Sequence, residues 1–429
     1  MKPEEFRIYH EEKFKKAVSQ FQIFKNYKNK DSLLSLLDYW LFSTSAIYFS
    51  YGPMALKKFS SSSINNPPRW SFLYEFDVES EIKNHLISSS FLSKGLSFLP
   101  KVYLPGGPII SIFDKILSRL SKFLVLLIPV KFEQSQAKIL EELVTSYFND
   151  LEVVVTDELL QKIPQVFKSE QLTLFNDSAL KVFCSPHTFM DFIGYENIFL
   201  LNTRIEVKGF QHGGGYGLFT TDYYSFYEKE LSHNFYGWGF LEENVKQFKY
   251  HKITSKNEEK RVIWLERPYF PKILKYLNEG QYVQYSSSKV ISSIHRSLGD
   301  LSDDYFNMTY PGTYKSGDYI GYRGKSIKKA NAYAEDLIKL NDIVVLDCSA
   351  ASIIHFLIHN SIVFLLVIDN QSEPFFTENH SKWLAVLREN NLCFFEEEIE
   401  SIQKSINNLL SDRYELPKEV KEIHSTFFN

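Results

Sequence analysis

Short apolar runs alternate with amphipathic stretches along most of the chain beyond residue 130. The apolar runs predict strands, whereas Gln136–Phe148 and Ile327–Leu340 have the spacing of helices. Strands that alternate with helices are typical of an open parallel sheet, so this pattern predicts an α/β fold. The predicted strands are Leu151–Glu158 (which includes the turn that follows the strand), Leu180–Cys184, Ile198–Leu201, Ile205–Phe210, Arg261–Leu265, Tyr305–Tyr310, Asp342–Asp347 and Ile362–Ile368.

Three further helices are predicted, one near the N-terminus and two in the last part of the chain. The apolar spacing of Leu33–Phe49 predicts a helix near the N-terminus. A second helix is predicted after Asp347, and with its two flanking strands it makes a βαβ unit. Glu396–Leu410 predicts a terminal helix whose first turn carries Glu396, Glu397 and Glu398, where the helix dipole favours negative charge.

The length of the chain and one polar stretch predict the domain organisation. A chain of 429 residues suits two domains of ordinary size. Leu241–Lys260 is polar and lysine-rich, without a strand signal until Arg261. We therefore predict an N-terminal domain over 1–243, whose first part is helical, a second domain over 244–410 and a tail over 411–429.

Composition and charge exclude several classes of protein. The hydrophobic share of 44% and charged share of 23% are typical of soluble globular proteins, and a net charge of −4 gives no general attraction to nucleic acid. Cys184, Cys348 and Cys393 are far apart and form no CxxC pair, which indicates neither a zinc site nor a disulfide framework. The charged N-terminus lacks the apolar segment of a secretory signal, so the expected location is the cytoplasm.

One basic amphipathic stretch leaves a membrane association open. Lys115, Arg119 and Lys122 lie among apolar residues just before the apolar run Phe123–Val130. The stretch has the pattern of an in-plane membrane helix, which would place the protein at the inner face of the cytoplasmic membrane. The alternative is a surface helix that leads into a buried strand.

A glycine-rich turn directly follows the predicted strand Ile205–Phe210. The turn reads Gln211, His212, Gly213, Gly214, Gly215, Tyr216, Gly217. Consecutive glycines allow close approach of the backbone to a ligand, and a histidine adds a group that titrates near neutral pH. Glu228, in a predicted helix after the turn, is either a general base or nucleophile or part of a solvated helix face.

A second candidate site lies in the second half of the chain, at the carboxyl ends of predicted strands, where open α/β sheets bind ligands. The small residues Ser349, Ala350, Ala351 and Ser352 start a helix, so their N–H groups could hold a phosphate; alternatively, Ser349 caps the helix. Arg267 follows another strand and could pair with the same anion. A turn in between could form a second wall of the pocket, with Tyr310, Gly312, Thr313 and Lys315.

Several familiar sites are absent from the sequence. The chain has no HExxH, GxxxxGK[ST], GxSxG or GxGxxG pattern, which argues against a zincin, a P-loop, a nucleophile elbow and a dinucleotide site. His355 and His359 have metal-ligand spacing but sit in an apolar helix, so we expect core histidines. No metal and no cofactor is predicted.

The glycine-rich turn, Glu228, Ser232 and Trp238–Gly239 together resemble a bacterial family of transferases in surface-carbohydrate biosynthesis. That family looks like GT-B glycosyltransferases and is distantly similar to capsule Kdo transferases and to glycerophosphotransferases of teichoic acid. The resemblance implies two Rossmann-like domains that face each other across a cleft. The first would present a glycan or glycolipid acceptor and the second would hold a nucleotide sugar.

The resemblance also implies roles for individual residues. His212 and Glu228 would be catalytic. Substrate binding would involve Gln211, Gly213, Gly214, Gly215, Tyr216 and Trp238. The nucleotide-binding residues that we predict from the strand ends and the turn between them are Arg267, Tyr310, Gly312, Thr313, Lys315, Ser349, Ala350 and Ser352. The chain departs from the family at His355, where relatives carry a glutamate that contacts the donor.

Three hypotheses follow for the activity. The first is transfer of a sugar, such as a Kdo-like or nonulosonic acid on CMP, to a surface glycan without a metal. The second is polyol-phosphate transfer from a CDP-linked donor. The third is a non-catalytic glycan-binding protein on the same fold.

Overall fold

The computed structural model describes residues 2–24, 30–51, 74–75, 102–103, 134–161, 163, 182–185, 206–211, 215–230, 232–237, 245–247, 249–250, 252–265, 274–298, 305–308, 328–329, 338–411 and 414–422. Contacts divide the chain into two compact units. Unit 1 comprises Met1–Trp70, Phe76–His212 and Tyr223–Tyr236, and unit 2 comprises Ser71–Glu75, Gly213–Asp222 and Gly237–Asn429. The segment Gly213–Asp222 thus belongs to unit 2, although its two neighbours in the chain belong to unit 1.

Unit 1 combines a helical part with parallel strands. Its described helices are α1 (Pro3–Phe21), α2 (Lys30–Tyr51), α6 (Gln134–Asp150), α7 (Asp157–Gln161) and α9 (Tyr223–Glu230). Its strands β2 (Val102–Tyr103), β3 (Val182–Ser185), β4 (Glu206–Phe210) and β5 (Asn234–Gly237) pair in this order, and all these pairs are parallel. The short strand β6 (Val245–Gln247) belongs to unit 2. The predicted helix Leu33–Phe49 and the strand before the glycine-rich turn are confirmed.

Unit 2 is built on a parallel sheet of order β10-β9-β8-β11-β12-β13. The strands are β8 (Val262–Leu265), β9 (Tyr305–Met308), β10 (Lys328–Lys329), β11 (Ile343–Leu346), β12 (Val363–Ile368) and β13 (Cys393–Phe395). The helices are α10 (Leu274–Leu277), α11 (Glu279–Ser286), α12 (Ser288–Leu298), α14 (Ala351–His359), η4 (Asn370–Phe375), α15 (Glu378–Glu389) and α16 (Ile399–Ser411). A short antiparallel pair joins β1 (Tyr74–Glu75) and β7 (Lys249–Tyr250). The predicted α/β class and the βαβ unit β11-α14-β12 are confirmed.

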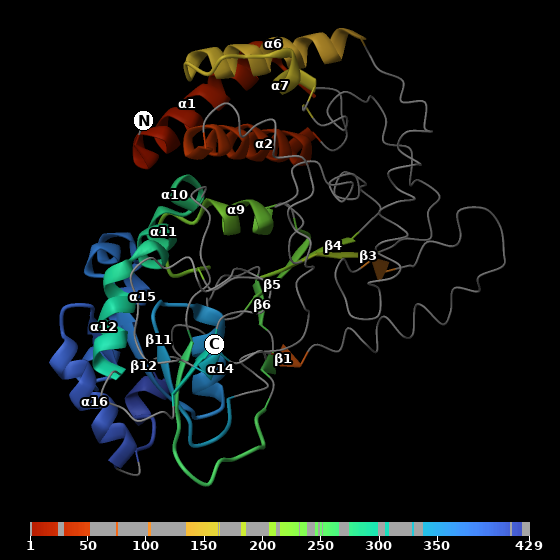
Figure 1. Ribbon diagram of the computed structural model, residues 1–429. Helices are drawn as coiled ribbons and strands as arrows, with labels where there is room; N and C mark the ends of the chain where they lie inside the picture. The colour runs from red at the N-terminus through yellow and green to blue at the C-terminus, as the bar shows by residue number, and fades with distance from the viewer. Residues whose placement is uncertain are drawn as a thin grey trace. The chain divides into compact units, whose positions relative to one another are not determined.

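Helices cover both faces of this sheet, as its continuous apolar strands require. Alternate strand residues such as Trp264, Val345 and Val367 form one core with α12 and α16. Their neighbours, including Val344 and Leu366, are also fully buried. Figure 1 shows α14 on the other side of the sheet from α12 and α16.

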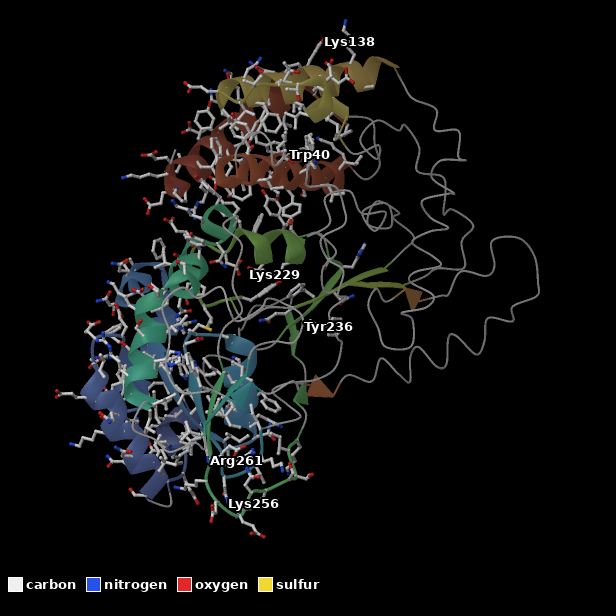
Figure 2. The ribbon with its side chains drawn as sticks, viewed as in Figure 1. Trp40, Lys138, Lys229, Tyr236, Lys256 and Arg261 are labelled. Atoms are coloured by element: carbon white, nitrogen blue, oxygen red, sulfur yellow. The ribbon has the colours of Figure 1, made fainter. Side chains whose placement is uncertain are left out.

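A partly buried ion pair fixes the start of β11 beside β8. Asp342 is buried and accepts hydrogen bonds from Arg261 Nε at 3.0 Å and Nη2 at 2.8 Å. Asn257 Nδ2 and the Lys339 backbone N–H donate to the same carboxylate at 2.5 and 2.7 Å. Arg261 lies directly before β8 (Figure 2), so these bonds hold two neighbouring strands in register where both begin.

The predicted strand Leu151–Glu158 is wrong. The N–H groups of Leu151 and Val153 donate to Phe148 O, so this segment closes the end of α6 instead of pairing in a sheet. Glu152 takes a left-handed conformation, with φ of 57°, and the helix α7 begins at Asp157. The run of three valines had suggested a strand, but Val154 is 72% exposed.

Three further boundaries differ from the prediction. Polar residues that gave no strand signal form β6 and β7 between Leu241 and Lys260. The predicted helix Ile327–Leu340 contains the strand β10, and Ile338–Leu340 is not helical. α16 begins at Ile399, after the three glutamates, because these make other bonds: Glu396 accepts from Asn370 N and Glu398 from Phe395 N.

The described helices give no membrane span, and the stretch with the pattern of an in-plane membrane helix is not among the described residues. None of the described helices combines the length and the apolarity needed to cross a bilayer. The basic amphipathic stretch and the apolar run at 115–130 lie outside the described residues, as does the predicted strand Ile198–Leu201.

Candidate functional site

Ser349 lies at the carboxyl end of β11, between that strand and α14. It is fully buried, and its backbone N–H donates to Gln284 Oε1 of α11 at 3.0 Å. Its hydroxyl is hydrogen-bonded to His380 Nε2 of α15 at 2.9 Å. The side chains of Gln284 and His380, from two other helices, therefore hold the N–H and the hydroxyl of Ser349.

His380 is a neutral histidine inside unit 2. It is fully buried, and burial lowers its pKa to about 3. Its ring lies 4.7 Å from that of Phe376 and 6.4 Å from that of Phe219, measured between centroids. Among the described residues, its second ring nitrogen Nδ1 has no hydrogen-bond partner. The imidazole therefore acts through one polar contact, the bond to Ser349.

The start of α14 carries no side-chain cap. Ala350 occupies the N-cap position, and no side chain there accepts a hydrogen bond from the first turn. The alternative in which Ser349 caps the helix is thus wrong, because its hydroxyl is bound to His380 instead. An uncapped N-terminus leaves N–H groups and the positive end of the helix dipole for another acceptor, such as an anion.

The segment that follows the glycine-rich turn packs beside His380. Phe219 forms a β-bridge with Phe376. The backbone N–H of Thr377 donates to Leu218 O at 3.0 Å, and its hydroxyl donates to Gly217 O at 2.9 Å. Gly217 has a φ of 71°, a conformation that favours glycine. Residues Gly215–Asp222 therefore lie against η4 and the start of α15.

Gly280 of α11 allows this close packing. A Cβ atom at this position would lie 2.6 Å from Phe219 Cδ1 and 2.6 Å from Phe375 Cβ. The Gly280 N–H also donates to Thr221 Oγ1 at 3.2 Å. The glycine thus lets α11, η4 and the segment Gly215–Asp222 meet at one point.

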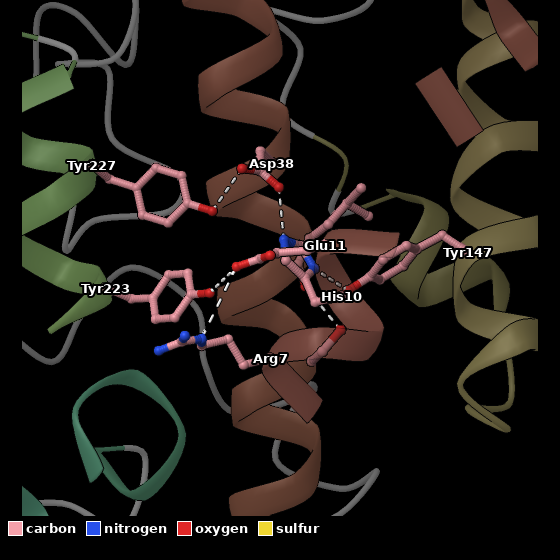
Figure 3. Close-up of polar contacts among 9 residues, drawn as sticks. Arg7, His10, Glu11, Asp38, Tyr147, Tyr223 and Tyr227 are labelled. Atoms are coloured by element: carbon pink, nitrogen blue, oxygen red, sulfur yellow. Dashed lines mark hydrogen bonds and ion pairs between the residues drawn. The ribbon is translucent and has the colours of Figure 1, made fainter. Parts of the chain in front are cut away.

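Helix α9, which carries Glu228, is held by hydrogen bonds to α1 and α2. Tyr223 donates to Glu11 Oε1 at 2.6 Å, and Tyr227 donates to Asp38 Oδ2 at 2.7 Å. Figure 3 shows both tyrosines reaching from α9 toward these carboxylates. Burial raises the pKa of Tyr227 well above its ordinary value, so the phenol stays protonated and donates.

A family match gives this geometry a context. Residues 37–291, more than half of the chain, match the model of a family described as LIC12162 family transferase. The chain belongs to the LIC12162 family of transferases. Among solved structures, it is similar to "Crystal Structure of CalG4, the Calicheamicin Glycosyltransferase", at 9% identity and a TM-score of 0.35, with 76% of this chain and 85% of that chain covered. No curated protein matches the chain.

The structure brings together part of the predicted site of this LIC12162 family member. Tyr216 is buried in the segment whose later residues pack beside His380, the partner of Ser349. Gln211 is also buried, and its backbone N–H donates to Tyr236 O of β5 at 2.8 Å. Both lie in the same stretch as Gly215, yet their assignment to substrate binding stays a prediction.

Other predicted residues fall outside the description. Glu228 and Ser352 belong to α9 and α14, but their side chains are not described. The remaining predicted residues outside the described ranges are His212, Gly213, Gly214, Trp238, Arg267, Tyr310, Gly312, Thr313 and Lys315.

The two histidines of α14 differ in their burial. His355 is buried, as predicted for a core histidine, whereas His359 is exposed, so the prediction for His359 is wrong. No group of three or more potential metal ligands occurs in the described part of the chain.

The sequence alone does not identify His380 or Gln284 as partners of Ser349. Both contact Ser349 from positions 31 and 65 residues away in the sequence. The local sequence signal for this region is Thr377, the N-cap residue of α15, whose hydroxyl accepts a hydrogen bond from the His380 N–H. It predicts a helix there, but not which residue the histidine meets.

Proposed function

We propose that this LIC12162 family transferase is a GT-B glycosyltransferase that acts on a bacterial surface glycan or glycolipid. The observation that carries the proposal is the family match, which makes the chain a member of a transferase family. The two parallel sheets are compatible with the two Rossmann-like domains that such enzymes use. The donor is a nucleotide sugar, and a Kdo-like or nonulosonic acid on CMP is our first candidate.

The nucleotide side of the proposed site is the start of α14. Ligands of open α/β sheets bind at the carboxyl ends of strands, and α14 begins directly beyond β11. Its first turn lacks a side-chain cap, which supports the binding of a phosphate there. In this proposal the leaving phosphate is stabilised by Ala350, Ser352 and Arg267, without a metal ion.

The reacting side is assigned to His212 and Glu228. One of them acts as general base or as nucleophile toward the acceptor or the sugar. In this proposal Ser349 supports the loop before α14, because its N–H is bound to Gln284 and its hydroxyl to His380.

A screen of thermal stability with free nucleotides tests the proposal. A ligand at about 100 times its dissociation constant stabilises the folded protein by roughly 2.7 kcal/mol, which shifts the melting temperature measurably. We expect a shift with CMP and none with UDP or GDP. A shift with CDP alone would favour the polyol-phosphate transferase, and a shift with no nucleotide would contradict transfer from a nucleotide donor.

A further inference from the structure

A continuous chain of hydrogen-bonded side chains runs from α9 through three other helices of unit 1. Asp38 of α2 accepts from Tyr227 on one oxygen and bonds His10 Nε2 on the other, at 2.6 Å. His10 Nδ1 is bonded to Tyr147 OH of α6, also at 2.6 Å. The chain Tyr227–Asp38–His10–Tyr147 therefore joins α9, α2, α1 and α6 (Figure 3).

The chemistry of this chain determines which groups donate. An ionised carboxylate only accepts, so His10 Nε2 carries the hydrogen that faces Asp38. Burial raises the pKa of Tyr147 as well as that of Tyr227, which keeps both phenols protonated. Hydrogen bonds to a charged acceptor are stronger than neutral ones and more demanding in geometry.

These bonds fix α9 in a way that apolar packing alone does not. The helix has eight residues, and isolated helices this short are unstable in water. Tyr223 and Tyr227 are one turn apart, so both bonds emerge from one side of the helix. Together they set the rotation of α9 about its axis and its position along α2.

The orientation of α9 sets the position of Glu228. The exposed residues of α9 include Phe226 and Glu230. Glu228 is two residues from each of them, which on an α-helix is about half a turn away. Its backbone position is therefore opposite the exposed face, on a helix whose rotation Tyr227 and Asp38 control.

We propose that Asp38, held by His10, is a positioning residue that orients α9 and thereby Glu228 for the transfer reaction. The proposal rests on the proposed function, because it takes Glu228 as the base or nucleophile. It assigns a role to a histidine and an aspartate that lie in the first 40 residues, a region in which no site residue was predicted.

The test is Tyr227→Phe in the full-length protein, since this change removes one hydroxyl group and keeps the ring. We expect kcat for donor turnover to fall by roughly 10- to 100-fold, with KM for the donor unchanged, because misplacement of a catalytic group impairs the chemical step. Asp38→Asn should likewise lower kcat and leave KM for the donor unchanged. The matched control is Tyr414→Phe, which removes a hydroxyl bond to Asn390 O in unit 2 and should leave kcat unchanged.

A second measurement separates positioning from general stability. In a Glu228→Gln background, Tyr227→Phe should cause no further loss of kcat, because the group that it positions is already gone. A folded Tyr227→Phe protein with wild-type kcat would contradict the inference. So would a full additional loss of kcat in the Glu228→Gln background. Neither result would contradict the proposed function. If the wild-type protein releases nucleotide from none of the donors tested, the proposed function fails, and the inference fails with it.

Discussion

His380 shows how one buried side chain can couple stability to pH. Its imidazole lies among Phe219, Phe376 and Trp383 and makes its one described polar contact with Ser349. A protonated ring would need a second acceptor at Nδ1, and the described residues supply none. The folded protein therefore resists protonation at this site, whereas the unfolded chain does not.

The sign of the pH effect follows from the two states. Between about pH 6.5 and the lowered pKa of about 3, the unfolded state binds a proton that the folded state does not. The free energy of unfolding should therefore fall as the pH is lowered through this range. One such proton contributes up to roughly 1.4 kcal/mol per pH unit.

His380→Gln tests this effect, because its amide can still bond Ser349 but does not titrate. Between pH 6.5 and 4.5, we expect the unfolding free energy of the wild type to fall relative to that of the variant as the pH is lowered. Urea titrations at several pH values measure it. Parallel curves for the two proteins would show that His380 does not carry this dependence.

At the scale of elements, the meeting of α11, η4 and the segment Gly215–Asp222 is very close. In most helices, alanine in place of glycine stabilises by roughly 1 kcal/mol. Here the added Cβ would lie 2.6 Å from both Phe219 and Phe375, so something must move. Overpacking of a dense interior typically costs about 1–3 kcal/mol, which outweighs the helical gain.

Gly280→Ala should therefore destabilise the protein by roughly 1–2 kcal/mol. Urea unfolding gives the value. Ser286→Ala, at an exposed position of the same helix, serves as the control and should stay within about 0.5 kcal/mol of wild type. A more stable Gly280→Ala protein would contradict the packing described around Phe219.

The elements that could be predicted are those with a strong apolar period. β8, β11 and β12 lie in the hydrophobic core of unit 2 and are continuously apolar, and α14 is mostly apolar. Leu151–Thr156 shows why others could not be predicted. The backbone N–H groups of Leu151, Glu152 and Val153 bond the last carbonyls of α6, and this use of the backbone leaves no periodic signal. Likewise, Glu396 belongs to a loop because it bonds Asn370 N, a contact 26 residues away.

At the scale of the whole molecule, contacts and chain order do not divide the protein in the same way. The turn after β4 belongs partly to unit 2, whereas α9 returns to unit 1. A single domain boundary, predicted from composition, cannot describe a chain that passes from unit 1 to unit 2 and back again. The candidate site could be predicted at Ser349, since small residues after a buried strand are a local signal, but its partners His380 and Gln284 depend on tertiary folding.

The central claim is that a nucleotide donor binds at the start of α14. Hydrogen exchange of the full-length protein, measured by mass spectrometry with and without saturating CMP, tests it most directly, because the first-turn N–H groups of α14 are the proposed ligands of the phosphate. We predict slower exchange in peptides that cover residues 349–354, and unchanged exchange over α16. Binding of CMP without protection of the start of α14 would contradict this account.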